Sequence, residues 1–167
     1  DILGLWQNKY KYILIDEFQD INRLQYEIIK MLALPQNNLF IVGDDDQSIY
    51  RFRGSKPEIM LGFEKDYPDA KRILLDTNYR CGKYIVDTSL NLISHNRERF
   101  EKKIIAASRS DVPVAFVNFE NRKDENLFLI RDIDKKMKDG AVFSDFAVLF
   151  RTNTQPRALI EQLMGYN

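Results

Sequence analysis

The chain of 167 residues contains one cysteine, Cys81, and carries no net charge. A single cysteine excludes an internal disulfide and a cysteine-rich zinc site. The 25 lysine and arginine residues balance the 25 aspartate and glutamate residues. A bulk electrostatic attraction to nucleic acid is therefore excluded, so any such contact must come from a local patch of charge.

Long apolar runs and targeting segments are also absent from the sequence. No apolar run approaches the roughly 18 residues typical of a membrane-spanning helix, and there is no signal-peptide pattern. We therefore expect a cytoplasmic location and no membrane partner. The apolar fraction of 44% is enough for a real core, in one domain of ordinary size or in parts of two.

A third missing feature is the glycine-rich phosphate loop that ends in lysine. Gly82 and Lys83 look like its end, but Thr77 stands where the first glycine is required and Tyr84 replaces the required hydroxyl residue. This loop cradles the β- and γ-phosphates of a nucleotide. We therefore expect the chain alone to be inactive in nucleotide hydrolysis.

The most informative segment is YILIDEFQD, residues 12–20. Its four apolar residues predict a strand buried on both faces of a parallel sheet, because no polar residue alternates with them. Asp16 and Glu17 follow at the carboxyl end, where open α/β sheets bind ligands, and such a pair suits Mg²⁺ and a water beside a phosphate. The alternative is that these acids only cap the next helix, for which Asp20 and Asn22 are a suitable start.

A second predicted strand, residues 39–42, also ends in acids. Gly43 allows a tight exit from this strand, so residues 44–47 are expected beside the first acidic pair at the same edge of the sheet. Asp45 and Asp46 leave open a second metal site, as in a nuclease. The loop continues as SIYRFRG, residues 48–54, in which aromatic and arginine side chains are interleaved. Taken by itself, this pattern also fits aromatics in a core with arginines outside.

Periodicity predicts the remaining elements. We expect helices over residues 22–34, 57–67, 84–93, 123–137 and 155–164, and strands over residues 72–75, 114–119 and 146–150. The order of strand, helix, strand and helix after residue 113 implies a second parallel sheet. The segment 97–109 has five cationic and two acidic side chains, and such a run is typical of a solvated surface.

Four segments together resemble the motor core of superfamily 1 DNA helicases of the Rep, PcrA and UvrD type. They are IDEFQD (15–20), VGDDDQSIYRFRGS (42–55), LDTNYRC (75–81) and AVLFRTN (147–153). These segments look like helicase motifs II, III and IV and a later strand, in the right order over nearly the whole chain. The resemblance implies an α/β fold with parts of two RecA-like motor domains, each a mostly parallel sheet flanked by helices. Residues 1–75 would be the second half of the first motor domain and residues 76–167 the first half of the second.

The resemblance also implies catalytic roles. Asp16, with Glu17 beside it, would bind Mg²⁺, and Glu17 would activate the water that attacks the γ-phosphate of ATP. Gln47 would sense that phosphate. Arg80 would reach it from the second motor domain and stabilise the charge that develops during transfer, while Tyr79 would stack on the adenine ring.

The same resemblance implies a grip on DNA. Tyr50 and Phe52 would stack on unpaired bases, and Phe52 stands where relatives often have tryptophan. Arg53 would contact the DNA backbone or brace the aromatic pair. Gln19 and Asp20 would hold the phosphate-binding network together, although a helix-cap role for Asp20 stays an alternative.

The function implied by this resemblance is an ATP-dependent DNA helicase. ATP and Mg²⁺ would bind between the motor domains and drive movement on single-stranded DNA and unwinding at duplex junctions, in DNA repair or replication restart. The phosphate loop and later motifs are expected in the remaining parts of the helicase chain. Two alternatives stay open: a non-catalytic, helicase-derived module that binds nucleic acid or protein, and a Mg²⁺-dependent nuclease that uses Asp16, Glu17 and the acids of residues 44–46.

Overall fold

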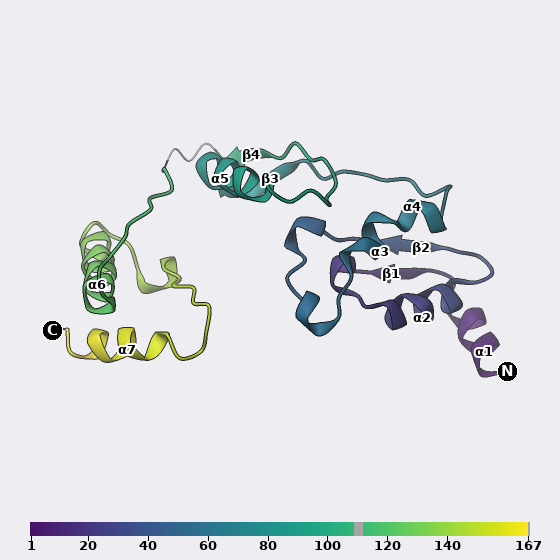
Figure 1. The fold of residues 1–167 in the computed structure, drawn as a ribbon, viewed down its shortest axis with the longest axis horizontal. Helices are drawn as coiled ribbons and strands as arrows, with labels where there is room; N and C mark the ends of the chain where they lie inside the picture. The colour runs from purple at the N-terminus through teal and green to yellow at the C-terminus, as the bar shows by residue number, and fades with distance from the viewer. Residues whose placement is uncertain (109–111, 167) are drawn as a thin grey trace. The chain divides into compact units, whose positions relative to one another are not determined.

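The computed structural model describes residues 1–108 and 112–166. Arg109, at the end of the basic segment, and Asp111, near the predicted restart of the pattern, lie outside the described residues. The chain forms two compact units, Asp1–Val114 and Ala115–Asn167, and each is described by itself (Figure 1). None of the described helices combines the length and the apolar character that a membrane span needs.

The first unit begins with the helix α1 (Ile2–Lys9), the strand β1 (Ile13–Ile15), the helix α2 (Arg23–Ala33) and the strand β2 (Leu39–Ile41). β1 and β2 pair in parallel, with Ile13 opposite Leu39 and Ile15 opposite Ile41. The predicted strand positions are confirmed. The predicted burial on both faces is wrong, because Leu14 and Phe40 on the second face are 69% and 57% exposed.

The core of this unit lies on one face of β1 and β2. Phe18, Ile21, Tyr26 and Ile29 are buried there, and the half-buried side chains of the two strands pack against them. The Phe18 ring meets the rings of Tyr26 and Phe63 edge-on, with centroids 5.9 and 5.6 Å apart. Aromatic rings favour this geometry. The packing fixes the segment that follows β1 against the sheet.

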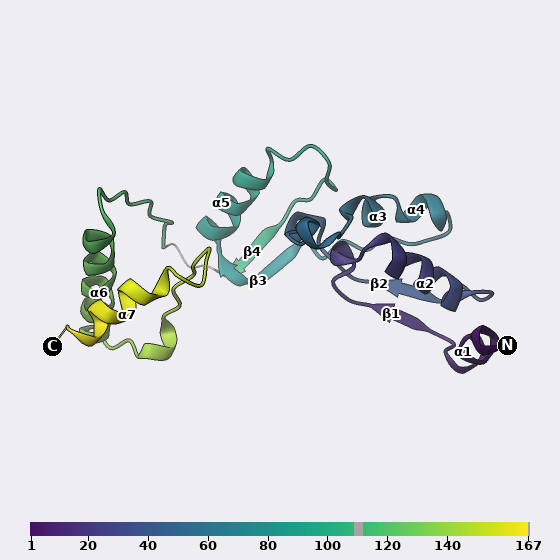
Figure 2. The same cartoon turned by 60° about the horizontal axis from the view of Figure 1, so that its bottom comes forward.

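The predicted helix over residues 57–67 is divided into α3 (Pro57–Leu61) and α4 (Phe63–Asp66). Gly62 ends the first helix with its N–H donated to Glu58 O, at φ −92° and ψ 0°. Met60 and Phe63 still pack on the same buried cluster as α2. Figure 2 shows α2, α3 and α4 beside the β1–β2 sheet.

A second parallel pair in the same unit contains β3 (Thr77–Gly82) and β4 (Ile105–Ser108), which are connected through α5 (Lys83–Ile93). The strand predicted at residues 72–75 is wrong, since the paired strand is the polar segment that follows it. The ladder begins where Ile105 N–H donates to Asp76 O and Thr77 lies opposite Ile105. Ile73 and Leu75 are both 80% exposed, because no described strand pairs with them.

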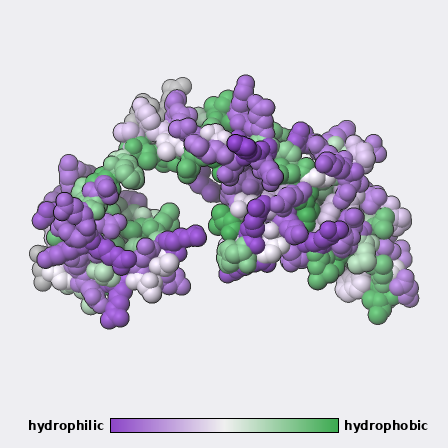
Figure 3. All heavy atoms as spheres, in the orientation of Figure 1, coloured by the Kyte–Doolittle hydropathy of each residue, from purple (hydrophilic) through white to green (hydrophobic). Residues whose placement is uncertain are grey.

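The second unit consists of α6 (Arg122–Lys138), a 3₁₀ turn at Phe143–Asp145 and α7 (Pro156–Met164). Both helices were predicted within one or two residues at each end. The strands predicted at residues 114–119 and 146–150 do not form in the described part of this segment. Phe116 and Leu149 are 94% and 93% exposed, and an extended apolar segment is stable as a strand only when a partner pairs with it. Apolar side chains also reach the surface elsewhere in the chain (Figure 3).

Candidate functional site

The acids that follow β1 lie at its carboxyl end and are exposed. Glu17 has a left-handed backbone conformation, with φ 51°, and its N–H donates to Asp16 Oδ1 at 2.9 Å. Residues other than glycine adopt this backbone conformation at a cost of roughly 1 kcal/mol or more, and residues strained in this way cluster at functional sites. The turn directs both carboxylates to solvent, where they are available to a ligand.

Gln19 connects this turn to the acidic loop that follows β2. Its side chain is buried, with 1% of the residue exposed. Gln19 Nε2 donates to Glu17 Oε2 at 2.7 Å, and Asp44 N–H donates to Gln19 Oε1 at 3.0 Å. The backbones are joined too, since Phe18 N–H donates to Val42 O at 2.9 Å. The prediction that the two acidic loops meet at one edge of the sheet is therefore confirmed.

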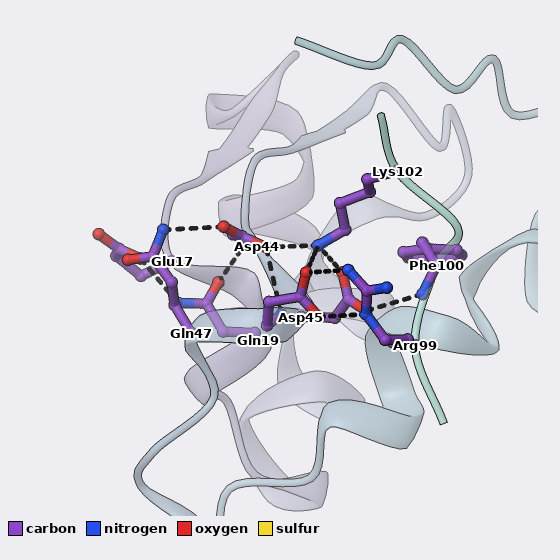
Figure 4. Close-up of polar contacts among 9 residues, drawn as sticks. Glu17, Gln19, Asp44, Asp45, Gln47, Arg99, Phe100 and Lys102 are labelled. Carbon is purple, nitrogen blue, oxygen red and sulfur yellow. Dashed lines mark hydrogen bonds and ion pairs between the residues drawn. The ribbon is translucent and has the colours of Figure 1, made fainter. Parts of the chain in front are cut away.

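Asp44 is the junction of the second loop (Figure 4). Gln47 Nε2 donates to Asp44 Oδ2 at 2.8 Å, and Lys102 Nζ donates to Asp44 Oδ1 at 2.5 Å. Burial alone would raise the pKa of the Asp44 carboxyl, but the hydrogen bonds from Lys102 and Gln47 hold this pKa below its usual range. Asp44 is therefore a carboxylate with a donor on each oxygen.

The ammonium of Lys102 lies among three consecutive carboxylates. It pairs with Asp44, with Asp45 and with Asp46 Oδ2, the last at 3.0 Å. The Lys102 side chain is 8% exposed. Burial would lower its pKa, but the three carboxylates raise it above the usual value. Lys102 therefore stays charged across the physiological pH range.

Arg99 and the backbone of Phe100 complete this cluster. Arg99 binds Asp46 with two parallel hydrogen bonds, from Nε at 2.8 Å and from Nη2 at 2.6 Å. Phe100 N–H donates to Asp45 Oδ2 at 2.8 Å. Burial would raise the pKa of the Asp46 carboxyl, yet the bonds from Arg99 and Lys102 lower it. The interpretation of segment 97–109 as solvated surface is thus wrong for Arg99 and Lys102.

The sequence carried a signal for this cluster that our interpretation missed. Three consecutive aspartates at the end of a strand cannot all be ionised in a partly buried loop unless cations approach them. The segment 97–109 is the richest cationic run in the second half of the first unit. A search for cations to balance the three acids would have pointed to it.

The two acidic sites differ in whether they suit a divalent metal. Ligand oxygens of Asp44, Asp45 and Asp46 lie within 4.8 Å of one another, a spacing compatible with an ion. The Lys102 ammonium already pairs with all three, so this cluster does not fit a resident metal. Asp16 and Glu17 do fit, because they are exposed carboxylates with the hard oxygen ligands that Mg²⁺ prefers.

The predicted DNA-gripping residues come together within one loop. The rings of Tyr50 and Phe52 have centroids 6.1 Å apart and planes inclined at 42°. The Arg53 guanidinium lies over both rings, at 5.2 and 5.4 Å from their centroids. Phe52 is 78% exposed, so the core interpretation of these aromatics is wrong. Arg51 turns away to pair with Glu58 at 2.5 Å.

A cavity of about 490 Å³ lies between the acidic loop and the β3–α5 segment. Gln47 lines it from one side, and Thr77, Asn78 and Cys81 line it from β3. Tyr79 and Arg80 are exposed on β3 and are not among the described residues that line this cavity. The structure therefore brings Asp16, Glu17 and Gln47 into one network but does not join Tyr79 and Arg80 to it.

Asp20 does not cap the helix after β1. Asn22 caps α2 instead, because its side chain accepts the Gln25 N–H while Gln25 Oε1 accepts the Asn22 N–H. This reciprocal pair satisfies two donors at the helix start. Asp20 belongs to the 3₁₀ turn Phe18–Asp20, and its Oδ1 is buried with no hydrogen-bond partner among the described residues. The network role proposed for Asp20 thus has no hydrogen bond to support it.

Comparison with known proteins matches the chain in two successive parts. Residues 1–68 match the UvrD/REP helicase N-terminal domain, and residues 73–167 match the UvrD-like helicase C-terminal domain. The chain is 49% identical over 165 residues to the protein YjcD of Bacillus subtilis (strain 168), covering 98% of this chain and 22% of that protein.

Two staphylococcal relatives match the chain over its full 167 residues. They are the ATP-dependent DNA helicases PcrA of Staphylococcus aureus (strain Mu50), at 41% identity, and of Staphylococcus epidermidis, at 40%. The chain covers 23% of each of them, so it spans less than a quarter of the length of these relatives. Since the C-terminal family model alone covers more than half of the chain, the chain belongs to the UvrD/Rep family of helicases.

Proposed function

We propose that this chain is the part of an ATP-driven DNA motor that connects the hydrolytic site to the grip on single-stranded DNA. The observation that carries the proposal is the continuous network from Glu17 through Gln19 and Asp44 to Gln47. Gln47 is three residues from Tyr50 in the same loop. One short loop can therefore couple the state of a phosphate to the stacking of a base.

The geometry at the end of β1 supports the roles that we propose in hydrolysis. Asp16 would hold Mg²⁺, which neutralises charge on the transferring phosphate. Glu17 would accept the proton of the attacking water, and its hydrogen bond from Gln19 fixes the direction of its carboxylate. Arg80 and Tyr79 would contact the γ-phosphate and the adenine ring, and their exposure on β3 leaves both side chains available for this.

The exposed aromatic loop supports the roles that we propose in DNA binding. Tyr50 and Phe52 offer faces on which bases stack, each worth roughly 1 to 3 kcal/mol without reading sequence. Arg53 lies over both rings, so it would brace them and offer a positive charge to the DNA backbone. Movement on single-stranded DNA and unwinding at a duplex junction would follow from alternating grip and release.

We further propose that the first motor domain ends near residue 75 and that the second begins at residue 76. The change of family model between residues 68 and 73 supports this division. The phosphate loop would come from the remaining parts of the helicase chain, and the 167 residues alone would not hydrolyse ATP. A role in DNA repair or replication restart and a cytoplasmic location are part of the same proposal.

A decisive test is Glu17→Gln in the intact protein that contains this chain. We expect the variant to lose ATP turnover, because the amide cannot accept the proton of the water, while its affinity for a single-stranded oligonucleotide stays unchanged. Glu120→Gln, which changes an exposed acid of the second unit, is the matched control. Full ATP turnover in Glu17→Gln would refute the assignment. Metal-dependent DNA cleavage without ATP would favour the nuclease alternative.

A further inference from the structure

The cations of the acidic cluster and the acids themselves come from different family domains. Asp44, Asp45 and Asp46 lie in the stretch that matches the N-terminal domain model, whereas Arg99 and Lys102 lie in the stretch that matches the C-terminal domain model. The residues that pair in this cluster are 53 to 58 positions apart in the sequence. The cluster therefore joins the two halves of the motor by charge.

The cluster is connected directly to the proposed hydrolytic site. Lys102 Nζ donates to one oxygen of Asp44 at 2.5 Å, and the other oxygen accepts Gln47 Nε2 at 2.8 Å. The backbone N–H of Asp44 donates to Gln19, which in turn donates to Glu17 at 2.7 Å. Three hydrogen bonds therefore lead from Lys102 to Glu17, and they are connected through Asp44 and the side chain of Gln19 (Figure 4).

The orientation of Gln47 depends on Asp44. A carboxamide has a donor end and an acceptor end, so holding Nε2 against Asp44 determines which end meets a phosphate or a water. Asp44 keeps its own orientation because Lys102 Nζ, at 2.5 Å, and the Asp46 N–H, at 3.2 Å, both donate to its second oxygen. Without this ammonium, the neighbouring carboxylates would repel Asp44 and the bond to Gln47 would lose its fixed acceptor.

Charge balance explains why the loop needs both cations. Three carboxylates lie together, and the Asp45 side chain is 1% exposed, so water cannot solvate it. Two cations approach them, and Arg99 neutralises Asp46 through a bidentate pair of hydrogen bonds. The Lys102 ammonium also reaches Asp46, at 3.0 Å, but it lies closer to Asp44 and Asp45. A buried carboxylate left without a cation would rearrange the loop.

We propose that Lys102, braced by Arg99, is a positioning residue for ATP hydrolysis. It holds the Asp44 carboxylate that orients Gln47, next to the Asp44 N–H that binds Gln19. The hydrolytic loop of the N-terminal family domain thereby depends on a cation of the C-terminal family domain. Separation of the two segments would release Asp44 and disorder the sensor side chain. This inference rests on the proposed function and deepens it.

The test uses the intact protein and measures kcat and KM for ATP with and without a single-stranded oligonucleotide. Lys102→Met keeps the length of the side chain and removes its charge. We expect kcat to fall about tenfold or more while KM for ATP and the affinity for the oligonucleotide change little, because orientation and not binding is lost. Lys103→Met, at the exposed neighbouring lysine, is the matched control and should behave as the wild type.

A double variant separates positioning from mere stability. Lys102→Met combined with Asp46→Asn removes one carboxylate charge together with the ammonium, so the repulsion in the loop falls and the melting temperature should recover. Asp44 still lacks the Lys102 ammonium, so kcat should stay low. Recovery of kcat together with stability would overturn the proposal, as would wild-type kcat in Lys102→Met. If Lys102→Met alone does not fold, the double variant decides by the same criterion.

Glu17→Gln in the same assay distinguishes the two levels of inference. Full turnover in that variant, or a wild-type protein without ATP turnover, would overturn the proposed function and this inference with it. Loss of turnover in Glu17→Gln together with an unaffected Lys102→Met would leave the proposed function standing and refute the positioning role alone.

Discussion

A Cβ atom on Gly43 would lie 2.5 Å from Oε1 of Gln19 and 3.0 Å from the backbone nitrogen of Phe18. The first distance is too short for any carbon and oxygen that are not bonded, and the second atom belongs to a backbone fixed by the core. Glycine at this position is therefore required by the close approach of the two acidic loops. Its freedom in φ is not the reason.

Gly43→Ala should consequently lower ATP turnover. The added methyl group displaces Gln19, which holds both Glu17 and Asp44, and a misplacement of about 1 Å at a catalytic group can reduce the rate roughly 100-fold. Steady-state hydrolysis by the intact protein measures this effect. Gly4→Ala in α1 is the control, since its Cβ would meet only Asp1 Oδ2 at an ordinary 3.7 Å. Unchanged turnover in Gly43→Ala would show that the Gln19 bridge is dispensable.

Arg80→Ala should lower kcat for ATP hydrolysis by roughly 1,000-fold or more, the effect of losing an arginine that stabilises transferred-phosphate charge. Arg80→Lys should recover little, because an ammonium lacks the planar fork. Phosphate release in the presence of single-stranded DNA is the measurement. Arg97→Ala, at another exposed arginine, should have no such effect. A small effect of Arg80→Ala would remove this residue from the hydrolytic site.

Phe52→Ala should weaken the binding of single-stranded DNA by roughly 5- to 150-fold, which corresponds to the stacking of one base at about 1 to 3 kcal/mol. Phe52→Trp should strengthen binding, since the larger ring offers more area. Fluorescence anisotropy of a labelled oligonucleotide measures both. Phe116, which is 94% exposed in the second unit, provides the control Phe116→Ala. Equal affinities of Phe52→Ala and the wild type would argue against stacking on this residue.

The acidic cluster should make stability depend on pH at both extremes. The pKa values of Asp44 and Asp46 are lowered in the folded protein, so their stabilising effect is present above the usual carboxyl range, near pH 4, and is lost as pH falls through the lower folded values. The pKa of Lys102 is raised. Its effect is therefore present below about pH 10 and is lost as pH rises through the folded value.

Urea denaturation at about pH 3, pH 7 and pH 11 tests this dependence. The midpoint of the wild type should be highest at neutral pH and fall at both ends. Lys102→Met should lower the urea midpoint at about pH 7 and reduce the fall of this midpoint toward low and high pH. Lys103→Met should reproduce the wild-type dependence of the midpoint on pH. Identical profiles for the two variants would mean that the cluster contributes nothing to folding.

The strands and helices of the first unit were predictable where local signals were strong. Asn22, followed three residues later by Gln25, marks the start of α2, and the apolar segments mark β1 and β2. The strand at Thr77–Gly82 was missed because its residues are polar and its pairing with Ile105–Ser108 is a long-range property. Residues 114–119 and 146–150 have strand composition but no strand partner among the described residues, which composition does not reveal.

The acidic residues of the candidate site were predictable because adjacent strand ends meet at one edge of a parallel sheet. The partners of Asp44, Asp45 and Asp46 were not, because Arg99 and Lys102 come from a segment more than 50 positions away. Local sequence specifies a charged run but not which of its side chains is buried. In this chain the side chains of Arg99 and Lys102 are partly buried, while Lys103 is exposed.

The distance in sequence between Asp44 and Lys102 also has a consequence during synthesis. A ribosome adds about 5 to 20 residues per second, so the 58 positions that separate the two residues correspond to roughly 3 to 12 seconds. During that interval the nascent chain exposes three adjacent carboxylates without their lysine. We expect the loop after β2 to lack a fixed conformation until Lys102 leaves the exit tunnel. The part that matches the N-terminal family domain would then complete its folding only after the part that matches the C-terminal family domain has begun to emerge.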